Sequence, residues 1–91
     1  MSRTVYVNGV YVPEEEARIS VFDRGFLFAD GVYEVTSVLG GKLIDFAGHV
    51  ARLHRSLGEL EMTLPVTDAE LLAIHRELVA RDGVEEGMVY L

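Results

Sequence analysis

A chain of 91 residues, of which 49% are hydrophobic and 25% charged, has room for one small folded domain and is too apolar to stay disordered. Its formal net charge of −7 argues against a nucleic-acid partner, because an acidic surface repels a phosphate backbone. The absence of cysteine excludes disulfides and thiolate metal sites. Because no long apolar run follows residues 1–4, we expect neither a signal peptide nor a membrane anchor, and by default a cytoplasmic protein.

The first elements in the chain are predicted to be two short strands joined in a hairpin. Residues 4–7 and 10–12 are rich in β-branched and aromatic side chains, and the Asn-Gly pair between them is typical of a two-residue type I′ turn. Pro13 ends the second strand, since it has no N–H to donate to a β-ladder. We interpret the acidic run at residues 14–16 as a solvated loop.

A second hairpin is predicted over residues 32–46. Residues 32–39 alternate between two faces, with Tyr33, Val35, Ser37 and Leu39 on one side and Val32, Glu34, Thr36 and Val38 on the other. The Gly-Gly pair that follows supplies a tight turn, and residues 42–46 form the returning strand.

Two helices are then expected, because the apolar period changes from two residues to 3.6. Asp45 is a suitable N-cap for the first helix, and Pro65 prevents its continuation. The apolar stripe of this helix consists of Phe46, Val50, Leu53, Leu57 and Leu60.

The second helix begins at Thr67, which forms a capping box with Glu70, with Val66 and Leu71 in the staple positions. Its predicted buried stripe is Leu71, Ile74 and Leu78, and Asp82-Gly83 ends it.

Residues 88–91 start a last strand, with no cap, turn or polar tail after it. We therefore expect the chain to be part of a longer protein; the alternative is a naturally short protein whose last strand docks in the sheet. Because strands and helices are segregated along the chain, the predicted fold class is α+β. The expected architecture has two layers, a mostly antiparallel sheet with two helices on one face.

Two segments contain candidate functional residues. In residues 23–31, two glycines and two aspartates surround large apolar side chains, so that Gly25 and Gly31 permit unusual backbone geometry while Phe26 and Phe28 anchor the segment. The alternative is a well-packed connecting loop. The three histidines lack the spacing of a metal site, so no metal is expected.

The second candidate is the pair His49 and Arg52 on the first long helix. At 100° per residue both lie on the flank of the apolar stripe, where a guanidinium stays charged and its planar fork suits phosphate oxygens. The alternative is a surface arginine whose stem covers the core.

Taken together, residues 19–35 (ISVFDRGFLFADGVYEV) and residues 48–53 (GHVARL) resemble the class IV, fold-type IV pyridoxal-phosphate aminotransferases. Residues 30–35 are most similar to the D-amino-acid aminotransferase branch. Branched-chain aminotransferases and aminodeoxychorismate lyases share parts of the pattern. The resemblance implies that residues 1–91 are the small N-terminal domain of such an enzyme, without the C-terminal domain that carries the cofactor lysine.

The resemblance also implies roles for individual residues. Arg52 matches the arginine that binds the phosphate of pyridoxal 5′-phosphate, Tyr33 helps to hold the substrate carboxylate, and Val35 lines the pocket for the substrate side chain. Supporting roles fall to His49, Asp23, Arg24 and Gly25. Lys42 does not match the lysine that forms the Schiff base, so no catalytic residue is expected in this chain and the fragment alone should be inactive.

The activity expected of the intact protein is transfer of an amino group between a D-amino acid and a 2-oxo acid, in a homodimer whose active site lies between two domains. Two alternatives are an aminodeoxychorismate lyase and a branched-chain aminotransferase built on the same domain. A third is a non-catalytic dimerisation or interaction module.

Overall fold

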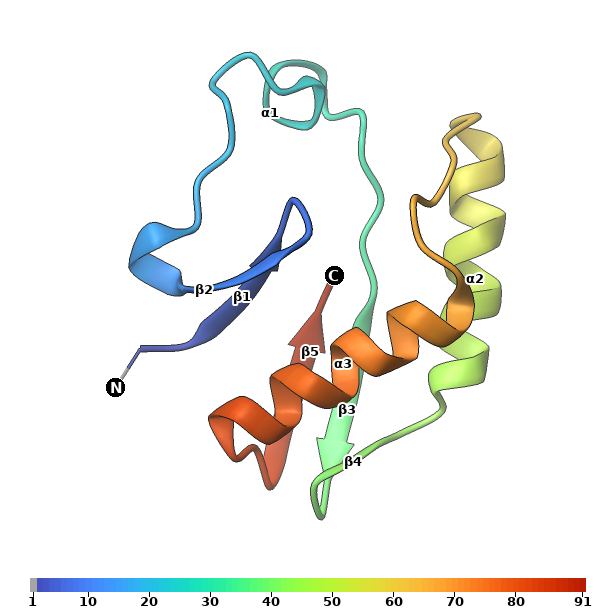
Figure 1. Ribbon diagram of the computed structural model, residues 1–91. Helices are drawn as coiled ribbons and strands as arrows, with labels where there is room; N and C mark the ends of the chain where they lie inside the picture. Colours follow the sequence, from blue (N-terminus) through green and yellow to red (C-terminus); the bar gives the residue numbers. More distant parts are fainter. Residues whose placement is uncertain (1) are drawn as a thin grey trace.

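The computed structural model describes residues 2–91, and its elements follow one another as a hairpin, two short helical turns, a second hairpin, two long helices and a final strand (Figure 1). Their bounds are β1 Thr4–Val7, β2 Val10–Pro13, the 3-10 helix η1 Glu14–Glu16, α1 Arg24–Phe28, β3 Val35–Leu39, β4 Lys42–Leu43, α2 Phe46–Glu59, α3 Asp68–Asp82 and β5 Glu86–Tyr90. The predicted α+β class is confirmed.

The first hairpin forms as predicted. The register pairs Val7 with Val10, and the two turn residues Asn8 and Gly9 have φ angles of 51° and 86°, as a type I′ turn requires. The acidic run that follows is a 3-10 helix rather than a loop, because the Ala17 N–H donates to the carbonyl of Glu14 at 3.2 Å and closes a tight turn.

The second sheet has three antiparallel strands in the order β4-β3-β5. The alternation predicted for β3 is confirmed: Glu34, Thr36 and Val38 are buried, whereas Tyr33 and Leu39 are exposed. Three boundaries differ from the prediction. β3 begins three residues later and β5 two residues earlier than expected, and β4 ends at Leu43 rather than continuing to residue 46.

The early end of β4 has a local cause. Asp45 adopts a φ of 54°, a left-handed conformation that turns the chain out of the sheet and into α2. Beyond the start of β3, Glu34 and Leu91 exchange both backbone hydrogen bonds, at 2.9 and 2.8 Å, so the pairing with the last strand extends one step further.

The prediction of a single sheet is wrong, because the two hairpins belong to different sheets. Strands β1 and β2 form a separate two-stranded sheet. This sheet is fastened to the end of α3 through Asp82, whose carboxylate accepts the Thr4 N–H at 2.9 Å and the Thr4 hydroxyl at 2.6 Å. The guanidinium of Arg81 also lies 4.3 Å from the centre of the Tyr11 ring.

Both long helices begin at the predicted caps, with the Asp45 carboxylate accepting the Gly48 N–H at 3.3 Å and Thr67 forming the expected capping box with Glu70. In α2 the stripe prediction is right for Val50, Leu53 and Leu57, which are buried. Leu60 is a correction: it lies at the end of the helix and is 45% exposed.

The buried row of α3 is Leu71, His75 and Val79. Leu71 is buried as predicted, whereas the predicted Ile74 and Leu78 are only half-buried. His75 fits in the core because its Nδ1 lies 2.9 Å from the carbonyl of Leu71 and its ring meets Phe46 edge-on at 5.0 Å. Burial lowers the pKa of His75, so the neutral imidazole is favoured.

The long helices cover one face of the three-stranded sheet, with α3 crossing β3 and β5 and α2 standing beside it (Figure 1). The core has two clusters. One packs the sheet against α3 and consists of Val38, Val79 and Val89. The other packs α2 against α3 and consists of Val50, Leu53, Leu57 and Leu71. The other face of the sheet has no helix over it in the described part of the chain. Within residues 2–91, no helix is both long and apolar enough to cross a membrane.

Candidate functional site

Glu34, His49 and Arg52 form a compact cluster where β3 meets α2. The Glu34 carboxylate accepts hydrogen bonds from Arg52 Nε at 2.7 Å (to Oε2) and from Arg52 Nη2 at 2.8 Å (to Oε1), and His49 Nδ1 lies 2.7 Å from the same Oε1. The predicted pair of α2 residues is thus brought together, with Glu34 as a shared partner that the sequence prediction did not include.

Glu34 and Arg52 are both ionised at neutral pH. The two bonds from the Arg52 guanidinium, followed by the bond to His49, lower the pKa of Glu34 from 4.5 to about 2. The same contact raises the pKa of Arg52, and the nearby phenol of Tyr33 acts in the same direction. The site therefore holds a fixed carboxylate and a fixed guanidinium whose charges largely offset each other.

Arg52 also has a free edge. Its side chain is 56% exposed, against 7% for that of Glu34. Both bonds to Glu34 use Nε and Nη2, and no described residue accepts a hydrogen bond from Nη1. A guanidinium held in this way directs its remaining N–H groups outward, where they can bind an oxyanion such as a phosphate.

Tyr33 lies on the opposite face of β3 from Glu34 and is 67% exposed. Its ring stacks on that of Tyr90 with centroids 6.0 Å apart and an interplanar angle of 13°. Val35 shares this face, is half-buried, and is the cross-strand partner of Tyr90. The uncovered face of the sheet thus presents two phenol hydroxyls beside an apolar patch.

The prediction from sequence missed Tyr90. The signal that could have identified it was the strand assigned to residues 88–91, because antiparallel pairing of that strand with residues 32–39 places an aromatic residue beside Tyr33 or Val35. The pairing partner of a final strand cannot be read from local sequence, so the neighbour stayed unidentified.

Asp23, Arg24 and Gly25 build the segment between the two hairpins. Asp23 caps the one-turn helix α1 by accepting the Gly25 N–H at 2.8 Å, and Arg24 forms an ion pair with Asp30 at 2.6 Å. A Cβ at residue 25 would lie 2.9 Å from the Asp23 carboxylate, so a larger residue there would displace the capping oxygen. In the described chain, every hydrogen bond of residues 20–31 stays within the segment, which is not joined to the Arg52 cluster.

The prediction that Phe26 and Phe28 anchor this segment is wrong. They are 70% and 64% exposed, because the one-turn helix α1 holds them away from both core clusters. The segment is therefore ordered by its own polar contacts, and its apolar side chains are open to solvent.

The residues present fit only the phosphate end of pyridoxal 5′-phosphate. Arg52 offers a charged, half-exposed donor, whereas the chain's only lysine, Lys42, lies at the start of β4 among a different set of side chains. Within residues 2–91, no group of three or more histidine, aspartate or glutamate side chains gathers as a metal site.

This arrangement agrees with a comparison of the sequence with known families. The pattern of the family described as amino-transferase class IV matches residues 31–91, which is more than half of the chain and includes Glu34, His49 and Arg52. The chain therefore belongs to the class IV aminotransferases.

Among curated proteins, the chain is similar to several named D-alanine aminotransferase. It is 36% identical over 87 residues to that of Staphylococcus haemolyticus and 38% identical over 87 residues to that of Listeria monocytogenes serotype 4b. These alignments include 96% of this chain but only 31% and 30% of the two relatives, so the chain spans about a third of their length.

Proposed function

We propose that residues 1–91 are the small N-terminal domain of a pyridoxal-phosphate-dependent aminotransferase that moves an amino group between a D-amino acid and a 2-oxo acid. The observation that carries this proposal is the half-exposed guanidinium of Arg52, held by Glu34 and His49 with its Nη1 edge free. The names of the relatives favour D-alanine as the amino donor.

Each side chain has a defined task in this proposal. Arg52 binds the cofactor phosphate through its free N–H groups, and Glu34 and His49 keep the guanidinium in place. Tyr33 donates its hydroxyl to the substrate carboxylate, and Val35 lines the pocket for the substrate side chain. When bound, pyridoxal phosphate supplies the electron sink that amino-group transfer needs.

The chemistry also requires a lysine that bonds to the cofactor and carries a proton. Lys42 does not qualify, because it lines a cleft on β4 and α3 and has no contact with the Arg52 cluster in the described chain. We propose that the lysine lies in a C-terminal domain outside these 91 residues, so the isolated chain has no transaminase activity.

Exposed apolar surface supports a role for further protein in completing the site. Between residues 19 and 28, six large apolar side chains are 48–78% exposed: Ile19, Val21, Phe22, Phe26, Leu27 and Phe28. On the uncovered face of the sheet, Leu39, Met88 and Tyr90 are 60–70% exposed. Surfaces of this kind mark protein contacts. We infer that the C-terminal domain and the second subunit of a homodimer cover them.

The decisive experiment is an assay of the intact protein with D-alanine and 2-oxoglutarate as substrates, measuring pyruvate and glutamate together. Equal amounts of both products support the proposal. L-leucine in place of D-alanine tests the branched-chain alternative. Release of pyruvate from aminodeoxychorismate, without any amino transfer from D-alanine, would identify a lyase instead. An intact protein that forms a dimer but binds no pyridoxal phosphate would be an interaction module.

A further inference from the structure

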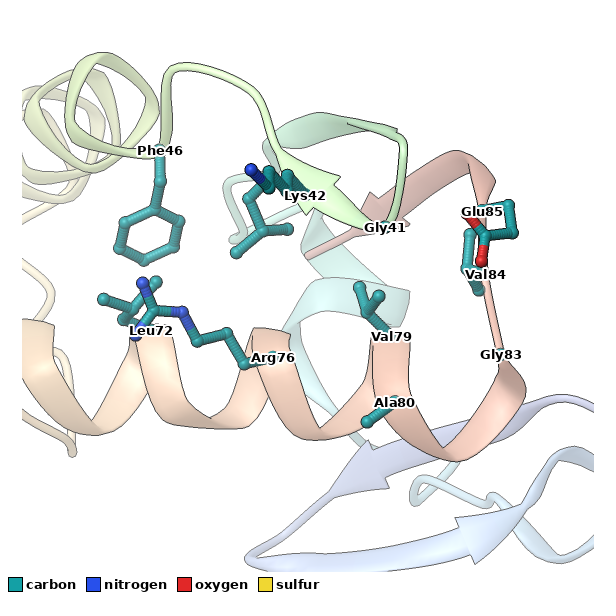
Figure 2. Close-up of a pocket in the computed structure, with 11 residues that line it drawn as sticks. Gly41, Lys42, Phe46, Leu72, Arg76, Val79, Ala80, Gly83, Val84 and Glu85 are labelled. Atoms are coloured by element: carbon teal, nitrogen blue, oxygen red, sulfur yellow. The ribbon is translucent and has the colours of Figure 1, made fainter.

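A second concave site lies away from Arg52, between β4, the first turn of α2 and the inner side of α3 (Figure 2). This cleft has a volume of about 710 Å³, within the range of about 300–1,000 Å³ that is usual for small-molecule sites. Its walls are mostly apolar and come from Leu43, Phe46, Leu72, Val79, Ala80 and Val84.

Two cationic side chains, Lys42 and Arg76, line the cleft. Figure 2 shows the Arg76 guanidinium between Phe46 and Leu72 at one end of the cleft, the Lys42 amine on the rim formed by β4, and Glu85 at the opposite end. Neither cation has a carboxylate within ion-pair distance among residues 2–91; the same holds for Arg18 and Arg55, whereas Arg3, Arg24, Arg52 and Arg81 are paired. Although the whole chain has a net charge of −7, two unpaired cations at this cleft make the local potential there positive.

We propose that this cleft binds an amphipathic monoanion, namely a carboxylate attached to an aromatic or aliphatic body. The carboxylate accepts hydrogen bonds from the Arg76 fork and from Lys42, which together neutralise its charge. The body lies against Phe46, Leu43 and Val79 and is removed from water there.

The charge distribution also sets a selectivity. Glu85 closes the far end of the cleft, so a second anionic group on the ligand meets repulsion there. The cleft should therefore prefer a monocarboxylate to a dicarboxylate of similar length. A neutral analogue keeps the apolar contacts and loses the charged ones.

The site is separate from the one assigned to the cofactor phosphate. Phe46 is the first residue of α2, whereas Arg52 lies further along the helix and is bonded to Glu34, the residue before β3. Binding in the cleft does not depend on the proposed transaminase activity, and either proposal can fail without the other.

The test is a titration of the ¹⁵N-labelled 91-residue chain with 4-phenylbutyrate, followed by amide chemical shifts. Saturable shifts are expected at the amides of Gly41, Val79 and Gly83, which line the cleft. The neutral 4-phenyl-1-butanol and the dicarboxylate 2-phenylglutarate should each bind about tenfold more weakly, because one lacks the charge and the other adds a second one. Added salt should weaken binding of the carboxylate and leave the alcohol unaffected.

The double variant K42Q/R76Q should bind 4-phenylbutyrate at least about tenfold more weakly than the parent chain. The matched control is Arg55→Gln, since Arg55 is an exposed arginine on α2 that has no ion-pair partner within residues 2–91 and does not line the cleft. Unchanged spectra of both variants without ligand would establish that the fold is retained.

Three results would overturn the proposal. The first is an equal affinity for the acid and the alcohol, which would mean that the cations do not contribute. The second is shifts confined to the uncovered sheet face around Tyr33 and Tyr90, where an aromatic probe could adhere to exposed apolar surface. The third is an equal loss of affinity in K42Q/R76Q and in the Arg55 control.

Discussion

Replacing Glu34 with glutamine tests the central cluster directly. The change keeps the size of the side chain and one acceptor oxygen, but removes the charge that binds Arg52 and His49. Charge-assisted hydrogen bonds contribute about 1.5–3 kcal/mol, and solvent around the half-exposed Arg52 screens part of this. We therefore expect Glu34→Gln to lower the free energy of unfolding by about 2 kcal/mol at pH 7.

The pH dependence of that loss can be derived from the lowered pKa. Because the folded chain holds the pKa of Glu34 at about 2, below its ordinary value of 4.5, the folded state gains stability from the ionised form. This gain is complete above about pH 4.5 and disappears as the pH falls toward 2. The difference between parent and variant should therefore shrink steadily between pH 5 and pH 3.

Urea denaturation followed by circular dichroism measures both quantities. The control is Glu77→Gln, which removes an exposed i,i+4 pair with Arg81 and should cost no more than about 0.5 kcal/mol. A Glu34→Gln effect as small as the Glu77 control, or an effect that is the same at pH 7 and pH 3, would refute the account of the cluster given above.

Three further predictions concern the proposed site and the attachment of the first hairpin. In the intact protein, Arg52→Ala should weaken retention of pyridoxal phosphate by roughly 1.5–3 kcal/mol, measured by cofactor absorbance during dialysis, while Arg55→Ala should have no effect. Tyr33→Phe should raise KM or lower kcat and leave cofactor retention unchanged. Loss of cofactor in this variant would contradict the assignment of Tyr33 to the substrate carboxylate. Asp82→Ala should lower the free energy of unfolding of the 91-residue chain by about 1–3 kcal/mol in urea, because both hydrogen bonds to Thr4 are lost.

Local sequence was sufficient for features whose causes are local. The Asn8-Gly9 turn and the Thr67 capping box depend on residues no more than three positions apart, and both form as predicted. The alternation of residues 32–39 correctly grouped Glu34 with Thr36 and Val38 on one face, because the period of a strand sets which side chains share a side.

The remaining features depend on contacts between distant parts of the chain. The Glu34 carboxylate can be buried because it bonds to His49 and Arg52, which lie 15 and 18 positions further along the chain. His75 was left out of the α3 stripe since histidine is polar, but the edge of the Phe46 ring from the other helix covers it. One-turn helix α1 is too short to show a period, so the exposure of its phenylalanines could not be foreseen.

The contact between Glu34 and Arg52 bears on how strongly a small anion can be captured. A free arginine side chain samples many rotamers and loses about 2 kcal/mol of freedom when a ligand fixes it. In this chain that loss occurs during folding, before any anion arrives, so the guanidinium is preorganised. The arrangement also restricts the direction of approach, because only an anion arriving from the Nη1 side finds unused donors.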